Sequence, residues 1–190
     1  KARQEAIYKK TTELYPNDFR AYNNLGMMAY ANGDFTTAEN YFKQAASKDA
    51  NAPEVNTNLG YIELVKGNVA NAETYLSKST GANTANEALG NLYIKQGQYD
   101  RAVQAFGDTK TNSAALAQIL AKDYNKAKNT LNAVKNPDAY TDYLMAIVGA
   151  RTNNADLVKT SMAKVAQKDA TLAAKAQIDR EFAKYANEIK

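Results

Sequence analysis

Six of the nine glycines form three pairs, and the two glycines of each pair are seven residues apart. The pairs are Gly26 with Gly33, Gly60 with Gly67, and Gly90 with Gly97. A leucine precedes the first glycine of each pair. An alanine follows the second glycine after five residues, and a large apolar residue comes four positions later. The pairs recur at intervals of 34 and 30 residues. Self-similarity at a period of about 20–50 residues indicates an array of structural repeats, which leaves few folds open.

Each repeat has the pattern of two helices joined by a tight turn. Apolar residues at helical spacing precede the second glycine, as in Tyr22, Leu25 and Ala29, and a second helical pattern follows it. The second glycine is expected to end the first helix, because it lacks a Cβ and adopts a left-handed conformation easily. Small residues such as Gly26 and Ala38 allow two antiparallel helices to approach closely. Such a pair must stack on copies of itself to bury its apolar surface.

This spacing resembles the tetratricopeptide repeat, a helix-turn-helix unit of about 34 residues. The first full repeat matches the family pattern at Tyr22, Leu25, Gly26, Gly33, Phe35, Ala38, Phe42 and Ala45. The second matches at Leu59, Gly60, Gly67, Ala72 and Leu76. The third matches at Leu89, Gly90, Tyr93, Gly97, Tyr99, Ala102 and Phe106. Three copies in register make the resemblance specific. It implies an all-α fold, a right-handed α-α superhelix (solenoid) of antiparallel helix pairs with a C-terminal capping helix.

The resemblance divides residues 1–190 into the units of one solenoid domain. We expect a half repeat at 1–18, clear repeats at 19–52, 53–82 and 83–111, a shortened repeat at 112–136, a degenerate repeat at 139–169 and a capping helix at 170–190. In the degenerate repeat Asn153 replaces the turn glycine. The capping helix would carry one apolar face, made of Leu172, Ile178, Phe182, Tyr185 and Ile189. Lys1 falls inside a helical pattern with no initiator Met, so we expect a fragment of a larger protein.

Composition excludes most catalytic chemistry. The sequence contains no Cys, no His and no Trp. Zinc sites of Cys and His, disulfides, thiol nucleophiles and histidine-dependent triads are therefore excluded. Asp179 and Glu181 are close in sequence but project from different faces of a helix, so they do not form a carboxylate pair. The sequence has neither a phosphate-binding loop nor a calcium loop. We expect no catalytic residue, no cofactor and no metal, and a chain that is not an enzyme.

Charge and hydropathy address two further classes of partner. The net charge is +4, and the whole excess lies in residues 96–190, with fourteen basic and ten acidic side chains. Lys122, Lys126 and Lys128 alternate with Asp123, as on a solvated helix surface. Because no recognised basic or aromatic binding motif accompanies these lysines, we expect no nucleic-acid partner. No stretch approaches the roughly 18 apolar residues that a membrane span needs, so we expect no direct membrane insertion.

The resemblance implies where a partner would bind, because the first helix of each tetratricopeptide pair lines an extended concave surface. The positions with this orientation are Arg20, Asn23, Met27, Tyr30, Thr57, Tyr61, Leu64, Glu87, Asn91, Ile94, Lys95, Tyr140, Tyr143 and Arg151. Tyr30, Tyr61, Tyr140 and Tyr143 each combine an apolar ring with a polar hydroxyl, which suits peptide contact. Other tyrosines stand at packing positions between helices, so a purely structural role is the alternative for these four.

The resemblance also specifies one ligand that the sequence can test. Chaperone-tail-binding members of the family hold a C-terminal carboxylate with Lys, Arg and Asn side chains at the concave face. Here Asn58 stands at one of the five positions concerned, but Asn23, Met27, Thr84 and Ala88 replace the residues at the other four. We therefore do not expect a chaperone-tail adaptor.

These observations favour a non-catalytic protein–protein interaction scaffold that binds a peptide or a partner protein on its concave face. Two alternatives stay open: a structural spacer that self-associates, and the recruiting arm of a larger multidomain envelope protein or enzyme. The Ala/Asn-rich repeats and the closing Asp-Arg-Glu-Phe-Ala-Lys-Tyr run resemble repeat regions of bacterial cell-envelope proteins. This resemblance implies a periplasmic or cell-envelope location, with the cytoplasm as the alternative.

Overall fold

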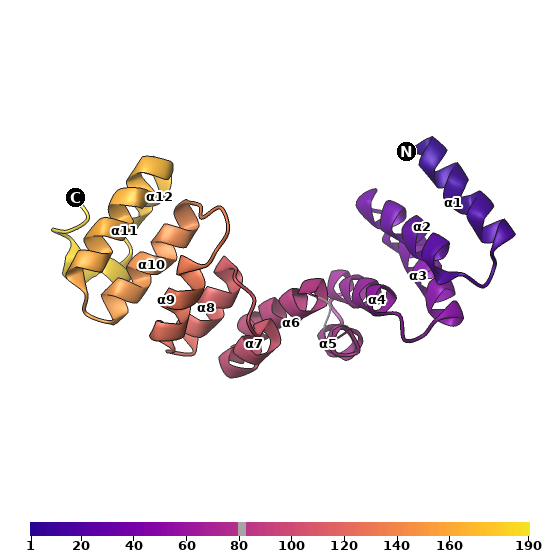
Figure 1. Cartoon of the computed structure of the whole chain (residues 1–190), viewed down its shortest axis with the longest axis horizontal. Coiled ribbons are helices and arrows are strands. Elements are labelled where there is room, and N and C mark those ends of the chain that lie inside the picture. The colour runs from indigo at the N-terminus through magenta and orange to yellow at the C-terminus, as the bar shows by residue number, and fades with distance from the viewer. Residues whose placement is uncertain (80–82) are drawn as a thin grey trace. The chain divides into compact units, whose positions relative to one another are not determined.

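The computed structural model describes residues 1–79 and 83–190, without the side chain of Asn83. These residues form α-helices and one 3-10 helix, and no β-strand occurs among them (Figure 1). The elements are α1 Ala2–Leu14, α2 Phe19–Ala31, α3 Phe35–Lys48, α4 Pro53–Val65, α5 Val69–Ser77, α6 Asn83–Lys95, α7 Tyr99–Phe106, α8 Asn112–Leu120, α9 Tyr124–Asn132, α10 Ala139–Arg151, α11 Ala155–Lys168, α12 Ala170–Ala176 and η1 Arg180–Tyr185. The predicted all-α class is confirmed. The predicted end of the second repeat, at residues 80–82, lies outside the described residues.

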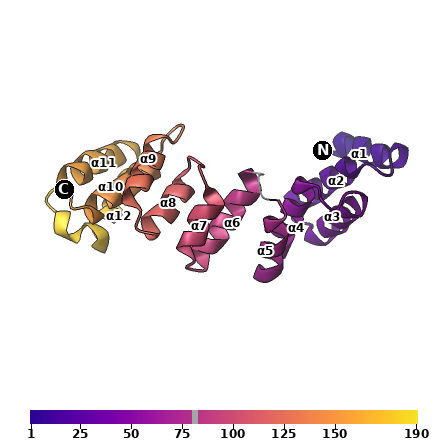
Figure 2. The ribbon, with the colours of Figure 1, turned by 60° about the horizontal axis from the view of Figure 1, so that its bottom comes forward.

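The chain divides into two compact units, and the division falls inside α6. Unit 1 is Lys1–Leu89 and contains α1 to α5 with the first half of α6. Unit 2 is Gly90–Lys190 and contains the remaining elements. Within the units, α2 packs on α3, α4 on α5, α8 on α9 and α10 on α11, and two views of the ribbon show these helices side by side (Figures 1 and 2). The helix-pair architecture follows the repeats found in the sequence.

Small residues allow the two helices of a pair to approach, as the spacing predicted. A Cβ added to Gly26 would lie 2.5 Å from the ring of Phe42, which fills the space between α2 and α3. The second repeat has the same arrangement, since a Cβ at Gly60 would lie 2.8 Å from the Leu76 side chain. Contacts this short do not occur between real side chains, so only glycine fits at these two positions.

Five inter-helix turns share one hydrogen-bond pattern. Their central residues all have a positive φ and are Gly33, Gly67, Gly97, Lys122 and Asn153. The amide after each of them donates to the carbonyl five residues earlier, at 2.8–2.9 Å. This pattern is a Schellman motif, which satisfies the last carbonyls of the first helix and starts the next one at once. Asn153 takes the turn position as predicted, and Lys122 takes it in the shortened repeat.

The repeats bury apolar residues between neighbouring helix pairs. The core of unit 1 is centred on Ala38, Phe42, Val55, Leu59 and Ile62. Two clusters of buried residues are described within unit 2. One contains Ala115, Ile119, Leu131, Leu144 and Val148. The other contains Tyr143, Val158, Met162, Phe182 and Tyr185. By contrast α1, which packs on α2, has no fully buried residue.

The C-terminal segment differs from the single capping helix that the sequence predicted. Helix α12 ends at Ala176, and η1 starts after Asp179, whose carboxylate accepts a hydrogen bond from the Glu181 amide at 2.9 Å. An Asp in this position caps a new helix, and its extended backbone interrupts the preceding one. As a result Ile178, which was expected on the apolar face, is 85% exposed, whereas Phe182 is fully buried.

Candidate functional site

The first helices of unit 1 are α2, α4 and the part of α6 that precedes residue 90; we call the side of these helices that carries the predicted partner-binding residues the inner face of unit 1. The Asn58 side-chain amide donates to Asn23 Oδ1 at 2.9 Å, which joins α4 to α2. The Tyr61 hydroxyl donates to the Thr84 carbonyl oxygen at 3.4 Å, which joins α4 to α6. Residues three, four or seven positions from these contacts lie on the same helix faces. We call this surface the unit 1 strip; it consists of Met27, Tyr30, Tyr61, Leu64, Val65 and Glu87.

The unit 1 strip exposes apolar side chains beside fixed aromatic rings. Met27 is 51% exposed and Val65 is 45% exposed, although both are apolar. Tyr30 and Tyr61 are half-buried. The ring of Tyr30 meets the ring of Phe35 edge-on, with 5.1 Å between the centroids. Half-buried rings held in this way have little conformational freedom left to lose when a partner binds.

The Tyr61 hydroxyl is a permanent hydrogen-bond donor on this strip. Burial raises the pKa of Tyr61, and the nearby charge of Glu87 and the Tyr30 hydroxyl raise it further. An acidic neighbour has this effect because it disfavours the phenolate. The phenol therefore stays protonated at neutral pH.

Two residues of the predicted partner-binding set are buried in unit 1. Asn23 is 6% exposed, because Asn58 hydrogen-bonds to it from the next repeat and its own amide points at Met27 Sδ, 3.8 Å away. Thr57 is 4% exposed, and its hydroxyl donates to the Pro53 carbonyl oxygen at 2.8 Å in the same helix. Both predictions are wrong: the Asn23 side chain links two helices, the Thr57 hydroxyl bonds within its own helix, and neither is exposed to a partner.

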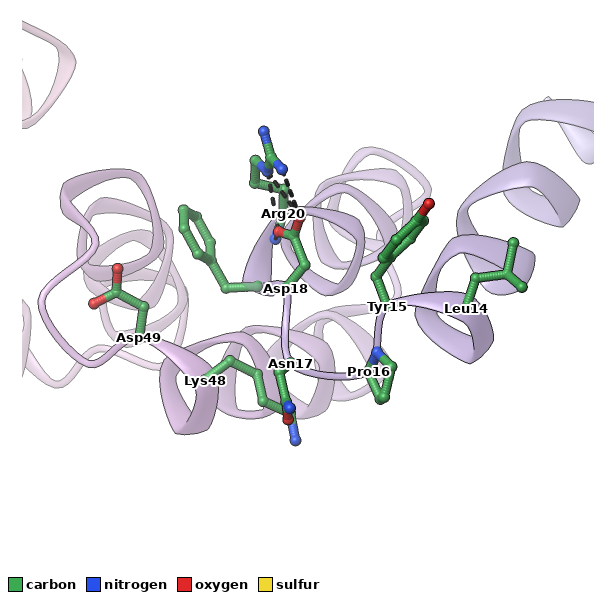
Figure 3. Close-up of a pocket in the computed structure, with 9 residues that line it drawn as sticks. Leu14, Tyr15, Pro16, Asn17, Asp18, Arg20, Lys48 and Asp49 are labelled. Carbon is green, nitrogen blue, oxygen red and sulfur yellow. Dashed lines mark hydrogen bonds and ion pairs between the residues drawn. The ribbon is translucent and has the colours of Figure 1, made fainter.

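Arg20 is exposed, but an acidic neighbour occupies its guanidinium. Asp18, the N-cap of α2, accepts hydrogen bonds from Arg20 Nε at 3.0 Å and from Arg20 Nη2 at 2.6 Å. The hydrogen bonds from Arg20 lower the pKa of Asp18 to about 2. Figure 3 shows the two side chains facing each other at the start of α2. Arg20 is therefore neutralised by its own helix cap before any partner arrives.

The loop between α1 and α2, which contains Asp18, forms the rim of an open depression of about 790 Å³. Its lining includes the exposed side chains of Leu14 and Tyr15, the end of α3 at Lys48, and Asp49 (Figure 3). Basic and acidic groups alternate around it, and Lys48 Nζ stands 5.9 Å from the ring centroid of Tyr22. The depression therefore combines apolar walls with balanced charge. No residue of the predicted set except Arg20 lines it.

In unit 2 the chain's own C-terminal segment covers part of the predicted binding face. Tyr143 is only 8% exposed, since its hydroxyl donates to the Asp179 carboxylate and its ring meets Phe182 edge-on at 5.4 Å between centroids. Arg151, at the end of the same helix, forms an ion pair with Glu181. Burial and the Asp179 carboxylate raise the pKa of the Tyr143 hydroxyl. The prediction that Tyr143 faces a partner is corrected, and Arg151 is already paired.

The remaining predicted residues of unit 2 are accessible. Asn91 and Ile94 are half-buried on the second half of α6, and Lys95 is exposed at its end. Tyr140 is 40% exposed in the first turn of α10, and burial of the rest of its side chain raises the pKa of its hydroxyl. Sequence reasoning missed the residues that cover α10, namely Asp179, Glu181 and Phe182, although the Asp at position 179 is a recognisable helix cap.

Other kinds of site are absent from residues 1–79 and 83–190 in two respects. Among these residues, no group of three or more His, Cys, Asp or Glu side chains is arranged to hold a metal ion. Within the same ranges, no helix is both long enough and apolar enough to cross a membrane. The inner face of unit 1 is therefore the candidate functional site that the side chains define best.

Comparison with known families identifies the class of this protein. Models of the tetratricopeptide repeat match residues 7–40, 25–87 and 87–110. Together they span residues 7 to 110, which is more than half of the chain. The chain belongs to the tetratricopeptide-repeat family, as the glycine spacing indicated, and its fold is that of protein–protein interaction scaffolds, which are generally non-catalytic. No curated protein matches the sequence.

Solved structures share the fold at low sequence identity. YrrB, a tetratricopeptide-repeat protein with an unusual peptide-binding site, is 18% identical with a TM-score of 0.67, and the match covers 88% of this chain and 97% of YrrB. Pseudomonas aeruginosa PilF is 14% identical with a TM-score of 0.68, covering 95% of this chain and 86% of PilF. PilW, a type IV pilus biogenesis factor, is 18% identical with a TM-score of 0.61, covering 94% and 87%. These likenesses show the fold alone.

Proposed function

We propose that this chain is a non-catalytic scaffold whose concave face binds an extended peptide or an extended segment of a partner protein, and that the unit 1 strip is the principal contact surface. One observation carries this proposal: two half-exposed apolar side chains, Met27 and Val65, flank the half-buried rings of Tyr30 and Tyr61. Partner-binding hot spots are rich in tyrosine and centre on such partly buried anchors.

The predicted residues of the last repeat are already engaged within the chain, and this favours unit 1 as the partner-binding surface. On α10, Tyr143 and Arg151 are already engaged by residues 179–182 of the same chain. In unit 1, by contrast, the strip residues Met27 and Val65 face solvent. Among the residues of unit 1 that the structure describes, no segment covers Met27 or Val65, so a partner that contacts them there displaces none of these residues. The peptide-binding site described for YrrB, which has the same fold, is consistent with this use of the surface.

A second candidate function is self-association through α1. Ile7 and Leu14 of this helix are 55% and 61% exposed, and no residue of α1 is fully buried. Exposed apolar residues on one helix face favour packing against a second apolar surface. Sedimentation velocity over a range of protein concentrations tests this candidate. It predicts dimers that Ile7→Ser combined with Leu14→Ser dissociates.

We further propose that the chain works in the bacterial cell envelope. The support is the resemblance of its Ala/Asn-rich repeats to envelope proteins, together with structural neighbours that include PilF and a type IV pilus biogenesis factor. Subcellular fractionation of the native host, with detection of the full-length protein, tests this location. Recovery with the cytoplasmic fraction would contradict it.

Peptide selection tests the principal proposal. Peptides selected from a random display library against the purified chain are measured by isothermal titration calorimetry with wild-type protein and with Tyr30→Ala combined with Tyr61→Ala. We expect the double change to weaken binding about 10-fold or more, as for paired hot-spot residues. Tyr15→Ala is the matched control, because Tyr15 is 63% exposed outside the strip.

Loss of binding with Tyr15→Ala alone would place the site in the depression beside α1 and would contradict the proposal. Because Tyr30 also packs on the core of unit 1, circular dichroism must show that the double variant stays helical. If it unfolds, the exposed pair Met27→Ser and Val65→Ser provides the test instead. Unchanged binding with this second pair would overturn the proposal.

A further inference from the structure

The inner helices of unit 1 carry four charged side chains, and two of them are neutralised locally. Arg20 is paired with Asp18. Glu63 is buried and accepts hydrogen bonds from Lys66 at 3.3 Å and from the Asn68 amide at 2.9 Å, which lower its pKa. The charged residues left on α2, α4 and the unit 1 part of α6 are Glu54 and Glu87. Among the residues that the structure describes, neither has an ion-pair partner.

These two acidic residues are not equivalent. Glu54 follows Pro53 in the first turn of α4, where an acidic side chain stabilises the helix dipole. Glu87 stands beyond the first turn of α6, so the dipole gives it no comparable stabilisation. It is half-buried, which weakens its hydration. A carboxylate that is partly desolvated and unpaired has much to gain from a cation.

The position of Glu87 beside Tyr61 defines where a cation would lie. Tyr61 reaches α6 by donating to the Thr84 carbonyl oxygen, and Glu87 is one helical turn after Thr84 on the same face. The Glu87 charge is also one of the causes that raise the pKa of the Tyr61 hydroxyl. An ammonium or guanidinium group beside both would meet a carboxylate and the electron-rich face of an aromatic ring.

Unit 2 shows how the corresponding surface binds a segment of complementary charge. Its inner helix α10 presents Arg151 and the Tyr143 hydroxyl, and the segment that covers it supplies Glu181 and Asp179. By the repeat spacing, Glu87 occupies in the third repeat the position that Tyr143 occupies in the late repeat. Unit 1 therefore has a hydrogen-bond acceptor, the Glu87 carboxylate, where unit 2 has a donor, the Tyr143 hydroxyl. A group that complements Glu87 must be positively charged, whereas the segment that covers Tyr143 supplies carboxylates.

We propose that the unit 1 strip binds an extended peptide segment in which a Lys or Arg side chain, held between the Glu87 carboxylate and the Tyr61 ring, is flanked by apolar residues that cover Met27 and Val65. This inference rests on the proposed function and adds the chemical class of the partner. The occupant is a basic, partly apolar segment of another protein. It is the reverse of the acidic segment that the chain supplies to its own α10.

Three peptides of equal length and apolar content test the proposal; they differ only in carrying Lys, Gln or Glu at the same positions. Isothermal titration calorimetry with the full chain is expected to rank their affinities Lys, then Gln, then Glu. Glu87→Gln should weaken the Lys peptide about 3- to 5-fold, the range for a partly exposed ion pair, and should leave the Gln peptide unchanged. Added salt should reduce the difference between the peptides.

Glu13→Gln is the matched control, because Glu13 is an exposed carboxylate of α1 outside the strip. Equal affinity for the Lys and Glu peptides, or an equal loss with Glu13→Gln and Glu87→Gln, overturns the charge assignment. If Tyr30→Ala with Tyr61→Ala still abolishes binding in that case, the proposed peptide-binding function survives. If no peptide binds, or if Tyr30→Ala with Tyr61→Ala leaves the peptide affinity unchanged, both proposals fail together.

A second copy of the chain is the competing source of basic groups, because residues 90–190 carry fifteen basic and ten acidic side chains. Sedimentation velocity distinguishes this source from a separate peptide. Concentration-dependent dimers that dissociate with Glu87→Gln would assign the strip to self-association and overturn the proposed partner. Wild-type protein that stays monomeric while binding the Lys peptide supports it.

Discussion

The ring of Phe42 on α3 lies directly against the backbone of Gly26 on α2, at a separation that leaves no room for even a methyl group. The same relationship joins Leu76 to Gly60 in the next repeat. A large side chain on the second helix and a missing side chain on the first thus form one packing element. It recurs with the repeat and sets the distance between the helices of each pair.

Gly26→Ala is therefore expected to destabilise unit 1. The higher helix propensity of alanine would by itself stabilise α2 by about 1 kcal/mol, so this effect opposes the overpacking of the added methyl group. Because the new Cβ would lie 2.5 Å from the Phe42 ring, overpacking dominates, and we expect a loss of about 1–3 kcal/mol. Urea unfolding followed by circular dichroism measures it. Asn40→Ala, at an exposed position of α3, is the control and should cost nothing.

Lys122→Gly is expected to stabilise unit 2. Lys122 holds a φ of 65° at the turn of the shortened repeat, where three other repeats have glycine. A left-handed conformation costs a non-glycine residue about 1 kcal/mol, which glycine avoids. Thermal unfolding should show a higher midpoint. Lys128→Gly, inside the exposed face of α9, should lower the midpoint, and an equal effect of both changes would contradict this account.

The Asp18 carboxyl is expected to titrate near pH 2, because hydrogen bonds from Arg20 stabilise its ionised form. Its pKa is lowered in the folded state, so the contribution to stability is present above about pH 4 and is lost as the pH falls towards 2. Carboxyl chemical shifts measured by NMR should give this midpoint, and Arg20→Gln should move it towards 3.8. The lowered pKa of Asp34, which depends on Thr37, should not respond.

Phe182→Ala is expected to destabilise unit 2 by about 3–5 kcal/mol, the usual cost of removing a buried aromatic ring. Phe182 is 1% exposed in the cluster with Tyr143 and Met162. Ile178→Ala removes an apolar side chain only four residues earlier, but Ile178 is 85% exposed and should leave stability unchanged. Guanidinium unfolding of both variants compares them. If the two changes cost similar amounts of stability, the result would favour the single amphipathic capping helix predicted from the sequence.

The helix pairs and their turns could be predicted because they depend on local, periodic features. Gly26 predicts a close contact between two helices, and Gly33 predicts a left-handed turn seven residues later. The same repeat pattern predicts the turn at Asn153, where no glycine is present. Each of these inferences needs only the residues of a single helix pair and the geometry of the α-helix.

The sequence by itself thus determined the class of fold and the position of the turns, since these arise from short-range periodicity, whereas the choice of the first helices as the inner face came from the resemblance to the family. Only the tertiary structure decided which inner-face residues are available. Asp179 reaches Tyr143 across 36 residues of sequence, and Asn58 covers Asn23 across 35. Hydrogen bonds and ion pairs between distant segments carry no periodic signal, because they depend on how each segment packs against its neighbours. Burial of Tyr143 and exposure of Met27 therefore follow from packing and from no pattern in the chain.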